Sequence, residues 1–280
     1  MEQFALSAFA DEYSPSIDGQ IEGLRKNGVG YMEIRGVDGT NISDITIEKA
    51  CEVREKLDRA GIRVSAIGSP IGKIDIEDDF EPHLEKFRHT AALARVLGCE
   101  RIRMFSFYHK NKTAEEARGE VMARLGRLLE EARAEKVVLC HENECGIYGD
   151  TPERCLDIQK TFGGEIACVF DHANFICSGC EPYPHGFDLL RDYILYMHIK
   201  DATPEKQIMP AGDGCGRIPE TLEALRQTGK RYILTVEPHL RVFAGLDKLE
   251  NLPDGGKVKN QFATSAEAFA AAVNAIKRYI

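Results

Sequence analysis

The sequence predicts a single closed (β/α)8 barrel that spans residues 1–280 as one domain. Eight short apolar runs recur along the chain, and segments with helical spacing or helix-start signals separate them. Alternating strands and helices predict a parallel sheet, because parallel neighbours require a crossover connection. Eight repeats without a linker or a break in composition favour the closed barrel over an open doubly wound sheet.

The expected strands are short and mostly apolar. In chain order they cover Ala5–Phe9, Tyr31–Ile34, Arg63–Ile67, Arg101–Phe105, Val137–Cys140, Ala167–Phe170, Tyr196–Ile199 and Tyr232–Val236. Three connections after strands exceed the usual length of about six residues: Gly68–Pro82, His172–Arg191 and His239–Thr264. They would lie at the C-terminal face, where active sites of this fold are built. We expect these loops to cover a pocket, and packing or dimer contacts are the alternative.

Helix-start signals support the expected helices between these strands. Thr113 and Glu116 form a capping box before a stripe of aliphatic residues. Pro152 and Pro219 stand where a first helical turn tolerates proline, since the missing N–H would be unpaired there. Ala266–Ile276 is expected to close the chain as an amphipathic helix.

Composition restricts the class of protein. The net charge of −9 disfavours a nucleic-acid partner, whose phosphates require Lys and Arg. No stretch approaches the ~20 apolar residues that span a bilayer, so no membrane association is expected. Nine scattered cysteines and the absence of a basic leader predict reduced thiols and a cytoplasmic location. A second, soft metal site is not expected, because the Cys177/Cys180 pair, with Cys145 and Cys215 in neighbouring loops, lacks a second C-x-x-C.

Ionisable residues stand at the C-terminal ends of the last four expected strands: Glu142, Asp171, His198 and Glu237. Each alone would be read as a salt-bridge partner, but four from adjacent strands would converge at the barrel mouth. Burial of a carboxylate is costly unless it is paired, hydrogen-bonded or bound to a metal. We therefore predict one divalent metal ion on these four ligands. Mn²⁺ is the expected ion, and Mg²⁺, Co²⁺ and Zn²⁺ are alternatives.

Three residues near the first strands are further candidates. Glu33 and Arg35 should point to the same face, where they form a barrel-mouth ion pair or contact a substrate. Lys73 lies in the loop after the third strand. It either reaches an anionic or hydroxyl group of a substrate or is an exposed loop lysine.

Two residues near the last strands are closer to the predicted metal. Lys200 should point to the same side as His198, where it holds a substrate oxygen or acts as an acid. Its neighbour Asp201 is expected to orient another residue. His239 follows Glu237 by two residues and is a candidate for lining the pocket.

Other polar residues nearby are expected to be structural. His141 and His172 flank ligand positions but should face the layer between barrel and helices. Gly212–Gly216 could cradle an anion through its backbone amides, although a flexible loop is the default interpretation.

These strand-end acids stand among longer motifs. Together with Ser7–Phe9, His198–Asp201 (HIKD), Pro210–Gly214 (PAGDG) and Val236–His239 (VEPH), they resemble the sugar phosphate isomerase/epimerase family. That family belongs to the xylose-isomerase-like barrel superfamily, with ketose 3-epimerases, hydroxypyruvate isomerase, inosose dehydratase and endonuclease IV. The resemblance covers nearly the whole chain. Its motifs are specific for the superfamily and do not choose the reaction.

The resemblance implies roles for the four strand-end residues. In the ketose 3-epimerases the metal ligands are Glu, Asp, His and Glu, which match Glu142, Asp171, His198 and Glu237. The two glutamates there exchange protons with opposite faces of the substrate carbon. The resemblance thus implies a divalent-metal-dependent isomerase or epimerase that acts on a small carbohydrate through a metal-stabilised enediolate.

Two departures from those epimerases concern the substrate site. Asn174 stands where they usually carry a substrate-binding histidine, and Lys200-Asp201 stands where an arginine follows shortly after the histidine ligand. Asn174 is a candidate substrate contact at this position. A simple ketohexose epimerase is accordingly in doubt.

Three other functions are compatible with the barrel. A lyase like inosose dehydratase needs the same metal and base, so the sequence does not separate it from an isomerase. A nuclease like endonuclease IV requires three zinc ions and many histidines, including one at the position of Asn174, and is disfavoured. A non-catalytic sugar-binding barrel is disfavoured by the intact ligand set. Assembly into a homo-oligomer stays open.

Overall fold

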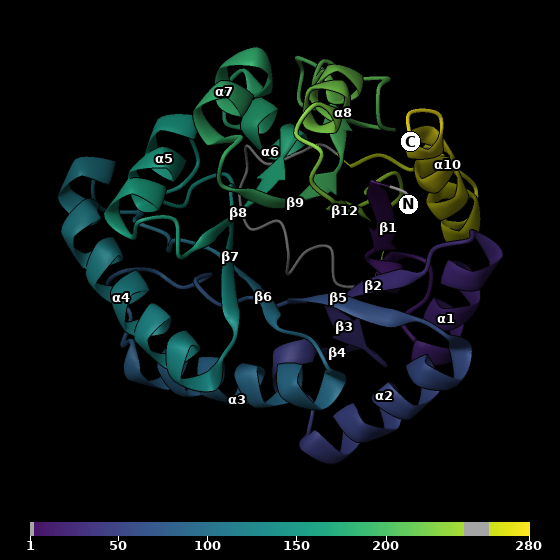
Figure 1. Ribbon diagram of the computed structural model, residues 1–280, viewed down its shortest axis with the longest axis horizontal. Helices are drawn as coiled ribbons and strands as arrows, with labels where there is room; N and C mark the ends of the chain where they lie inside the picture. Colours follow the sequence, from purple (N-terminus) through teal and green to yellow (C-terminus); the bar gives the residue numbers. More distant parts are fainter. Residues whose placement is uncertain (1–2, 244–257) are drawn as a thin grey trace.

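Eight parallel strands close into a barrel, which confirms the predicted fold class (Figure 1). The computed structural model describes residues 3–243 and 258–280. The strands are β1 (Phe4–Ala8), β2 (Tyr31–Ile34), β5 (Arg63–Gly68), β6 (Arg101–Met104), β7 (Val138–Glu142), β8 (Ala167–Asp171), β9 (Ile194–Ile199) and β12 (Tyr232–Val236). They adjoin in the order β1, β12, β9, β8, β7, β6, β5, β2, and β2 closes the ring on β1.

The register of the last strands brings their polar C-terminal residues to one level. Asp171 of β8 pairs with His198 of β9, and His198 pairs with Thr235 of β12. Glu142 ends β7 opposite Val169, and Glu237 directly follows the last residue of β12. Because parallel strands end at the same edge, the four predicted ligands meet at one face of the barrel.

Helices surround the barrel as an outer ring (Figure 1). They are α1 (Ile17–Lys26), α2 (Ile47–Ala60), α3 (Glu81–Leu97), α4 (Ala114–Glu135), α5 (Pro152–Thr161), α7 (Phe187–Leu190), α8 (Ile218–Arg226) and α10 (Ser265–Lys277). The predicted capping box is confirmed at α4, where Thr113 and Glu116 exchange hydrogen bonds of 2.8 and 3.3 Å. Pro152 and Pro219 lie in the first turns of α5 and α8.

The core lies mainly between the strands and this helix ring. Along α4 the predicted stripe is buried, including Val121, Leu125 and Leu128. A second, small apolar cluster comprises Ala66, Cys140, Val169 and Tyr196, which lie on barrel strands. None of the helices in the described part of the chain has the length and apolarity needed to span a bilayer.

Short elements occupy the connections after the strands. Two are small antiparallel pairs, β3 (Gly36–Val37) with β4 (Thr40–Asn41) and β10 (Asp201–Ala202) with β11 (Ile208–Met209). The helix α6 (His172–Cys177) begins the predicted 172–191 loop, which is therefore partly helical. Of the predicted 239–264 loop, residues 244–257 lie outside the described residues.

Candidate metal centre

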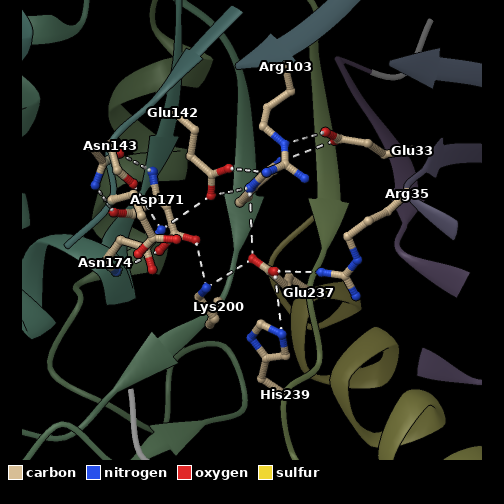
Figure 2. Close-up of polar contacts among 12 residues, drawn as sticks. Glu33, Arg35, Arg103, Glu142, Asn143, Asp171, Asn174, Lys200, Glu237 and His239 are labelled. Carbon is tan, nitrogen blue, oxygen red and sulfur yellow. Dashed lines mark hydrogen bonds and ion pairs between the residues drawn. The ribbon is translucent and has the colours of Figure 1, made fainter. Parts of the chain in front are cut away.

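The four predicted metal ligands form one buried group at the C-terminal edge of the barrel, and Figure 2 shows Glu142, Asp171 and Glu237 of this group. Glu142, Asp171, His198 and Glu237 each offer one oxygen or nitrogen atom, and these atoms all lie within 4.8 Å of one another. All four side chains are buried. The geometry therefore brings together every residue that the strand-end pattern singled out.

His198 is held between two carboxylates. Its Nδ1 atom lies 2.8 Å from Glu142 Oε1, and its Nε2 atom lies 3.1 Å from Glu33 Oε2. The Tyr196 hydroxyl donates to the other oxygen of Glu33 at 3.0 Å. Burial alone would lower the pKa of His198, but Glu142 and Glu33 raise it to about 10. The ring therefore turns Nδ1 toward the acidic ligands and Nε2 toward Glu33.

Asp171 is both the last residue of β8 and the N-cap of α6. Its Oδ1 atom accepts the backbone N–H of Asn174 at 2.8 Å, a normal N-cap contact. The amide of Asn143 binds the backbone N–H and C=O of Asp171, both at 2.9 Å. Its Oδ2 atom is buried without a hydrogen-bond donor among the residues that the structure describes. Burial raises the pKa of Asp171 to about 7, although Lys200 opposes this.

Glu142 is fixed by a cation and an amide. Arg103 Nη1 lies 3.3 Å from Oε2, and Asn174 Nδ2 donates to Oε1 at 3.2 Å. Burial alone would raise the pKa of Glu142, but His198 and Arg103 lower it to about 2. Sequence reasoning missed Arg103. The signal was a basic residue in the interior of a short strand, where burial of its charge is costly without a partner.

Glu237 lies between two basic side chains (Figure 2). Arg35 Nη1 is 3.1 Å from Oε1, and Lys200 Nζ is 3.0 Å from Oε2. Burial alone would raise the pKa of Glu237, but Lys200, His239, His198 and Arg35 hold it well below its usual range. Lys200 thus points to the same side as His198, as expected.

The expected ion pair between Glu33 and Arg35 is wrong. Glu33 contacts His198 and Tyr196, with Arg103 Nε at 3.9 Å. Arg35 instead binds Glu237 and, on its other side, Asp11 and Glu12. Both side chains reach the same ligand group, as strand alternation predicts, but each pairs there with a residue of another element.

His239 lies beside Glu237 in a strained conformation. Its φ is +44°, which is uncommon for a residue with a side chain, and Glu12 accepts its backbone N–H at 2.7 Å. Both buried ring nitrogens lack a hydrogen bond within the described parts of the chain. Burial lowers the pKa of His239 to about 3, so the ring is neutral at pH 7.

Glu12, Glu237 and His239 form a second group of closely spaced ligand atoms. The guanidinium of Arg35 lies 3.1 Å from Glu237 and 3.3 Å from Glu12. Arg35 thus pairs with both carboxylates of this second group, which offers three ligand residues. The Glu142 group offers four and is the better candidate for a metal.

Lys73 is not an exposed loop lysine. Its side chain is 10% exposed, its Nζ atom lies 3.3 Å from Glu144, and it packs 4.4 Å from the ring centre of Phe105. The structure thus places this cation in a defined polar contact after β5.

The Gly212–Gly216 segment does form an anion cradle, and the anion is the carboxylate of Asp201. The backbone N–H groups of Gly212, Gly214 and Gly216 donate to it at 3.0, 3.2 and 2.8 Å. A Cβ at Gly214 would lie 2.4 Å from Asp201 Oδ1, so glycine is required there. Asp201 thus binds this loop through three of its backbone N–H groups.

The two flanking histidines have hydroxyl partners within the protein. His141 pairs with the Ser106 hydroxyl and His172 with the Thr221 hydroxyl, both at 3.0 Å. All nine cysteines are free thiols. Within residues 3–243 and 258–280, neither Cys177 nor Cys145 belongs to a group of three or more closely spaced His, Cys, Asp or Glu ligand atoms.

The donor set fits a divalent cation. Three carboxylates and one imidazole are suitable ligands for Mn²⁺, Mg²⁺, Co²⁺ or Zn²⁺. Asp171 Oδ2 supports this fit, because it is a buried carboxylate oxygen that accepts no hydrogen bond from the described residues and has the ammonium of Lys200 3.4 Å away. Such an atom is costly unless a cation approaches it.

The chain belongs to the xylose isomerase-like TIM barrel family, which matches residues 21–268. Its fold is similar to that of an L-ribulose 3-epimerase, with 18% identity, 99% of this chain and 94% of that chain covered and a TM-score of 0.75. A probable 3-DHS dehydratase from Bacillus anthracis, AsbF, covers 99% of both chains at 16% identity and a TM-score of 0.74. The IolI protein with a bound zinc atom covers 99% of both chains at 17% identity and a TM-score of 0.72. No curated protein matches the sequence significantly.

Proposed function

We propose that this protein is a divalent-metal-dependent isomerase or epimerase of a sugar or sugar derivative. One observation carries the proposal. Glu142 and Glu237 belong to the same buried ligand group and come from the two outer strands, β7 and β12, of four adjacent strands. In the barrel, β8 and β9 separate β7 from β12, so the two glutamates flank Asp171 and His198. This arrangement suits two carboxylates that act on opposite faces of one substrate carbon.

Glu142, Asp171, His198 and Glu237 would hold the metal. A bound divalent ion would polarise a substrate carbonyl and its neighbouring hydroxyl, which acidifies the C–H between them and stabilises the enediolate. The family membership and the zinc atom of the IolI protein support such a site here. Mn²⁺ is our proposed ion.

Glu142 and Glu237 would transfer the proton. A base must be ionised, and His198 and Arg103 keep the pKa of Glu142 at about 2 against the effect of burial. Each carboxylate is also held in place, Glu142 by Arg103 and Asn174 and Glu237 by Arg35 and Lys200. One carboxylate removes the proton from carbon, and the other returns a proton to the same or the neighbouring carbon.

Of the five residues expected to contact the substrate, three remain candidates for that role and two are better placed to position the metal ligands. His239 is the strongest candidate, because both ring nitrogens are without hydrogen bonds from the described residues. Lys200 also lies beside the ligands, and Lys73 presents a cation after β5. Asn174 and Glu33 are hydrogen-bonded to Glu142 and His198, so we assign them to positioning the ligands.

An exchange experiment tests the proposal. The Mn²⁺-loaded protein is incubated in D2O with a panel of ketoses, sugar acids and inososes, and products are analysed by NMR and mass spectrometry. We expect an isomer with deuterium at the carbon next to the carbonyl. Loss of water instead would favour the dehydratase alternative, which the fold of the probable dehydratase AsbF also accommodates.

Glu237→Gln is the matching variant. Its amide oxygen can still bind a metal but cannot take a proton, so turnover should fall by about 10²–10⁴-fold while metal affinity changes far less. Glu153→Gln, at an exposed glutamate on α5, serves as the control. Full turnover by Glu237→Gln with its metal bound would contradict the proposed base.

A further inference from the structure

The ammonium group of Lys200 lies inside the ligand group. Its Nζ atom is 3.0 Å from Glu237 Oε2 and 3.4 Å from Asp171 Oδ2 (Figure 2). Lys200 is 6% exposed, so the charge is removed from bulk water. Two carboxylates that would bind the metal are therefore already bridged by a cation of the protein.

The other ligand carboxylates also have basic partners, but these lie at the periphery. Arg103 contacts Glu142, and Arg35 contacts Glu237 while its other edge binds Asp11. Among the lysine and arginine side chains that the structure describes, Lys200 alone contacts two ligands at once. It is also the partner of Asp171 Oδ2, the oxygen without a hydrogen bond from the described residues.

We infer that Lys200 is an internal counter-cation, which takes the place of the metal between Asp171 and Glu237 and must be displaced when a divalent ion binds. This inference rests on the proposed metal site. An ammonium and a divalent ion that share two carboxylates within a few ångströms repel each other strongly at low dielectric. The flexible four-carbon stem of lysine lets the ammonium withdraw. Once displaced, it is available to an oxygen atom of the substrate.

Two physical consequences follow for the free and metal-loaded protein. Without metal, Lys200 stabilises the fold, because it neutralises two buried carboxylates. With metal, the same charge weakens binding, because part of the metal's interaction energy is used to displace it. A residue that only positions Glu237 would have the opposite effect on metal affinity, since its loss would leave the ligand disordered.

Lys200→Met separates these roles, because it keeps most of the length of the side chain and removes the charge. Metal-stripped wild type and variant are titrated with Mn²⁺ by calorimetry, and their melting temperatures are measured with and without saturating Mn²⁺. We expect the metal-free variant to melt lower and to bind Mn²⁺ at least about ten-fold more tightly. The rise in melting temperature on saturation should be larger than in the wild type at equal Mn²⁺ concentration.

Two further variants control for charge and for mutation near the mouth. Lys200→Arg keeps the positive charge and should bind Mn²⁺ no more tightly than the wild type. Lys73→Met removes a similarly buried cation that pairs with Glu144, so its Mn²⁺ affinity should equal that of the wild type. If Lys200→Met folds only when Mn²⁺ is present, this dependence also supports the inference.

The failure of the inference is distinct from that of the proposed function. If wild type binds Mn²⁺ and Lys200→Met binds it equally or more weakly, the counter-cation role is wrong and the metal site stands. If only Lys200→Met binds Mn²⁺, competition is confirmed and a metal-dependent activity of the wild type is contradicted. If neither protein binds Mn²⁺, both proposals are overturned.

Discussion

The Nε2 atom of His198 lies 3.1 Å from Oε2 of Glu33, on the side of the ring opposite the acidic ligands. Glu33 comes from β2 and His198 from β9, on different sides of the barrel. A carboxylate at this position holds the proton on Nε2, so Nδ1 is the atom that would give up its proton to bind a cation. Glu33 therefore sets the orientation of a ligand that stands 165 residues away.

Replacement of Glu33 should consequently weaken metal binding without removing a ligand. We expect Glu33→Gln to lower Mn²⁺ affinity by about 10–100-fold, as is typical of residues that orient a metal ligand. Tyr196→Phe removes only the hydrogen bond to the other oxygen of Glu33 and should have a smaller effect. Calorimetric titration checks both variants, and unchanged affinity in Glu33→Gln would disprove the orienting role.

The carboxylate of Asp201 should be a major contributor to stability. Four backbone N–H groups donate to it, those of Ala202, Gly212, Gly214 and Gly216. Asp201→Asn replaces an acceptor oxygen with a donor and removes the charge, so the free energy of unfolding should fall by about 2–4 kcal/mol.

Urea denaturation measures this change, with one cooperative transition expected if residues 1–280 form a single domain. The control is Asp213→Asn in the same loop, where the half-exposed carboxylate pairs with Arg278 and contributes little. An equal effect of the two substitutions would show that the cradle does not hold the loop.

His83 should make stability depend on pH. Its Nε2 atom accepts the backbone N–H of Gly72 at 2.7 Å, which requires a neutral ring. Burial lowers the pKa of His83 from 6.5 to about 4. The unfolded chain therefore binds this proton more readily, and the contribution of His83 to stability is complete above pH 6.5 and is lost as the pH falls toward 4.

An NMR titration of the imidazole signals checks this prediction. The signal absent from His83→Gln belongs to His83 and should titrate near pH 4. The glutamine oxygen can accept the same N–H without titrating, so the loss of stability between pH 7 and 5 should be smaller in the variant. A His83 signal that titrates above pH 6 would contradict the assignment.

The cysteines should all be reduced. Thiol titration of the denatured protein should find nine groups, since all nine cysteines are free. In the native protein only the exposed Cys51 and Cys215 should react quickly. A tightly bound second metal, lost on joint replacement of Cys177 and Cys180, would contradict this prediction.

The sequence predicted the barrel because its strands recur with turn and helix-start signals between them, and these are local features. The ligand group followed from the same pattern, since parallel strands end at one edge and place Asp171 beside His198. These positions needed no knowledge of side-chain contacts.

The partners of those ligands were harder to predict because they are long side chains that reach the ligands from other elements. Arg103 reaches Glu142 from the neighbouring strand β6. Arg35 reaches Glu237, which lies 202 residues further along the sequence. Neither strand alternation nor motif spacing specifies which acid a long basic side chain will choose. The binding of the Asp201 carboxylate by the Gly212–Gly216 loop could not be predicted for the same reason, because a run of glycines does not specify which carboxylate its backbone amides will bind.

The metal content of the purified protein tests the central claim most directly. Wild type is stripped with a chelator, reloaded with Mn²⁺, desalted and analysed by elemental mass spectrometry beside an Asp171→Asn, His198→Gln double variant. We expect one ion per wild-type chain and almost none in the double variant, with both proteins folded by circular dichroism. Equal metal content in the two proteins would show that the ion, if bound, lies elsewhere than at Glu142, Asp171, His198 and Glu237.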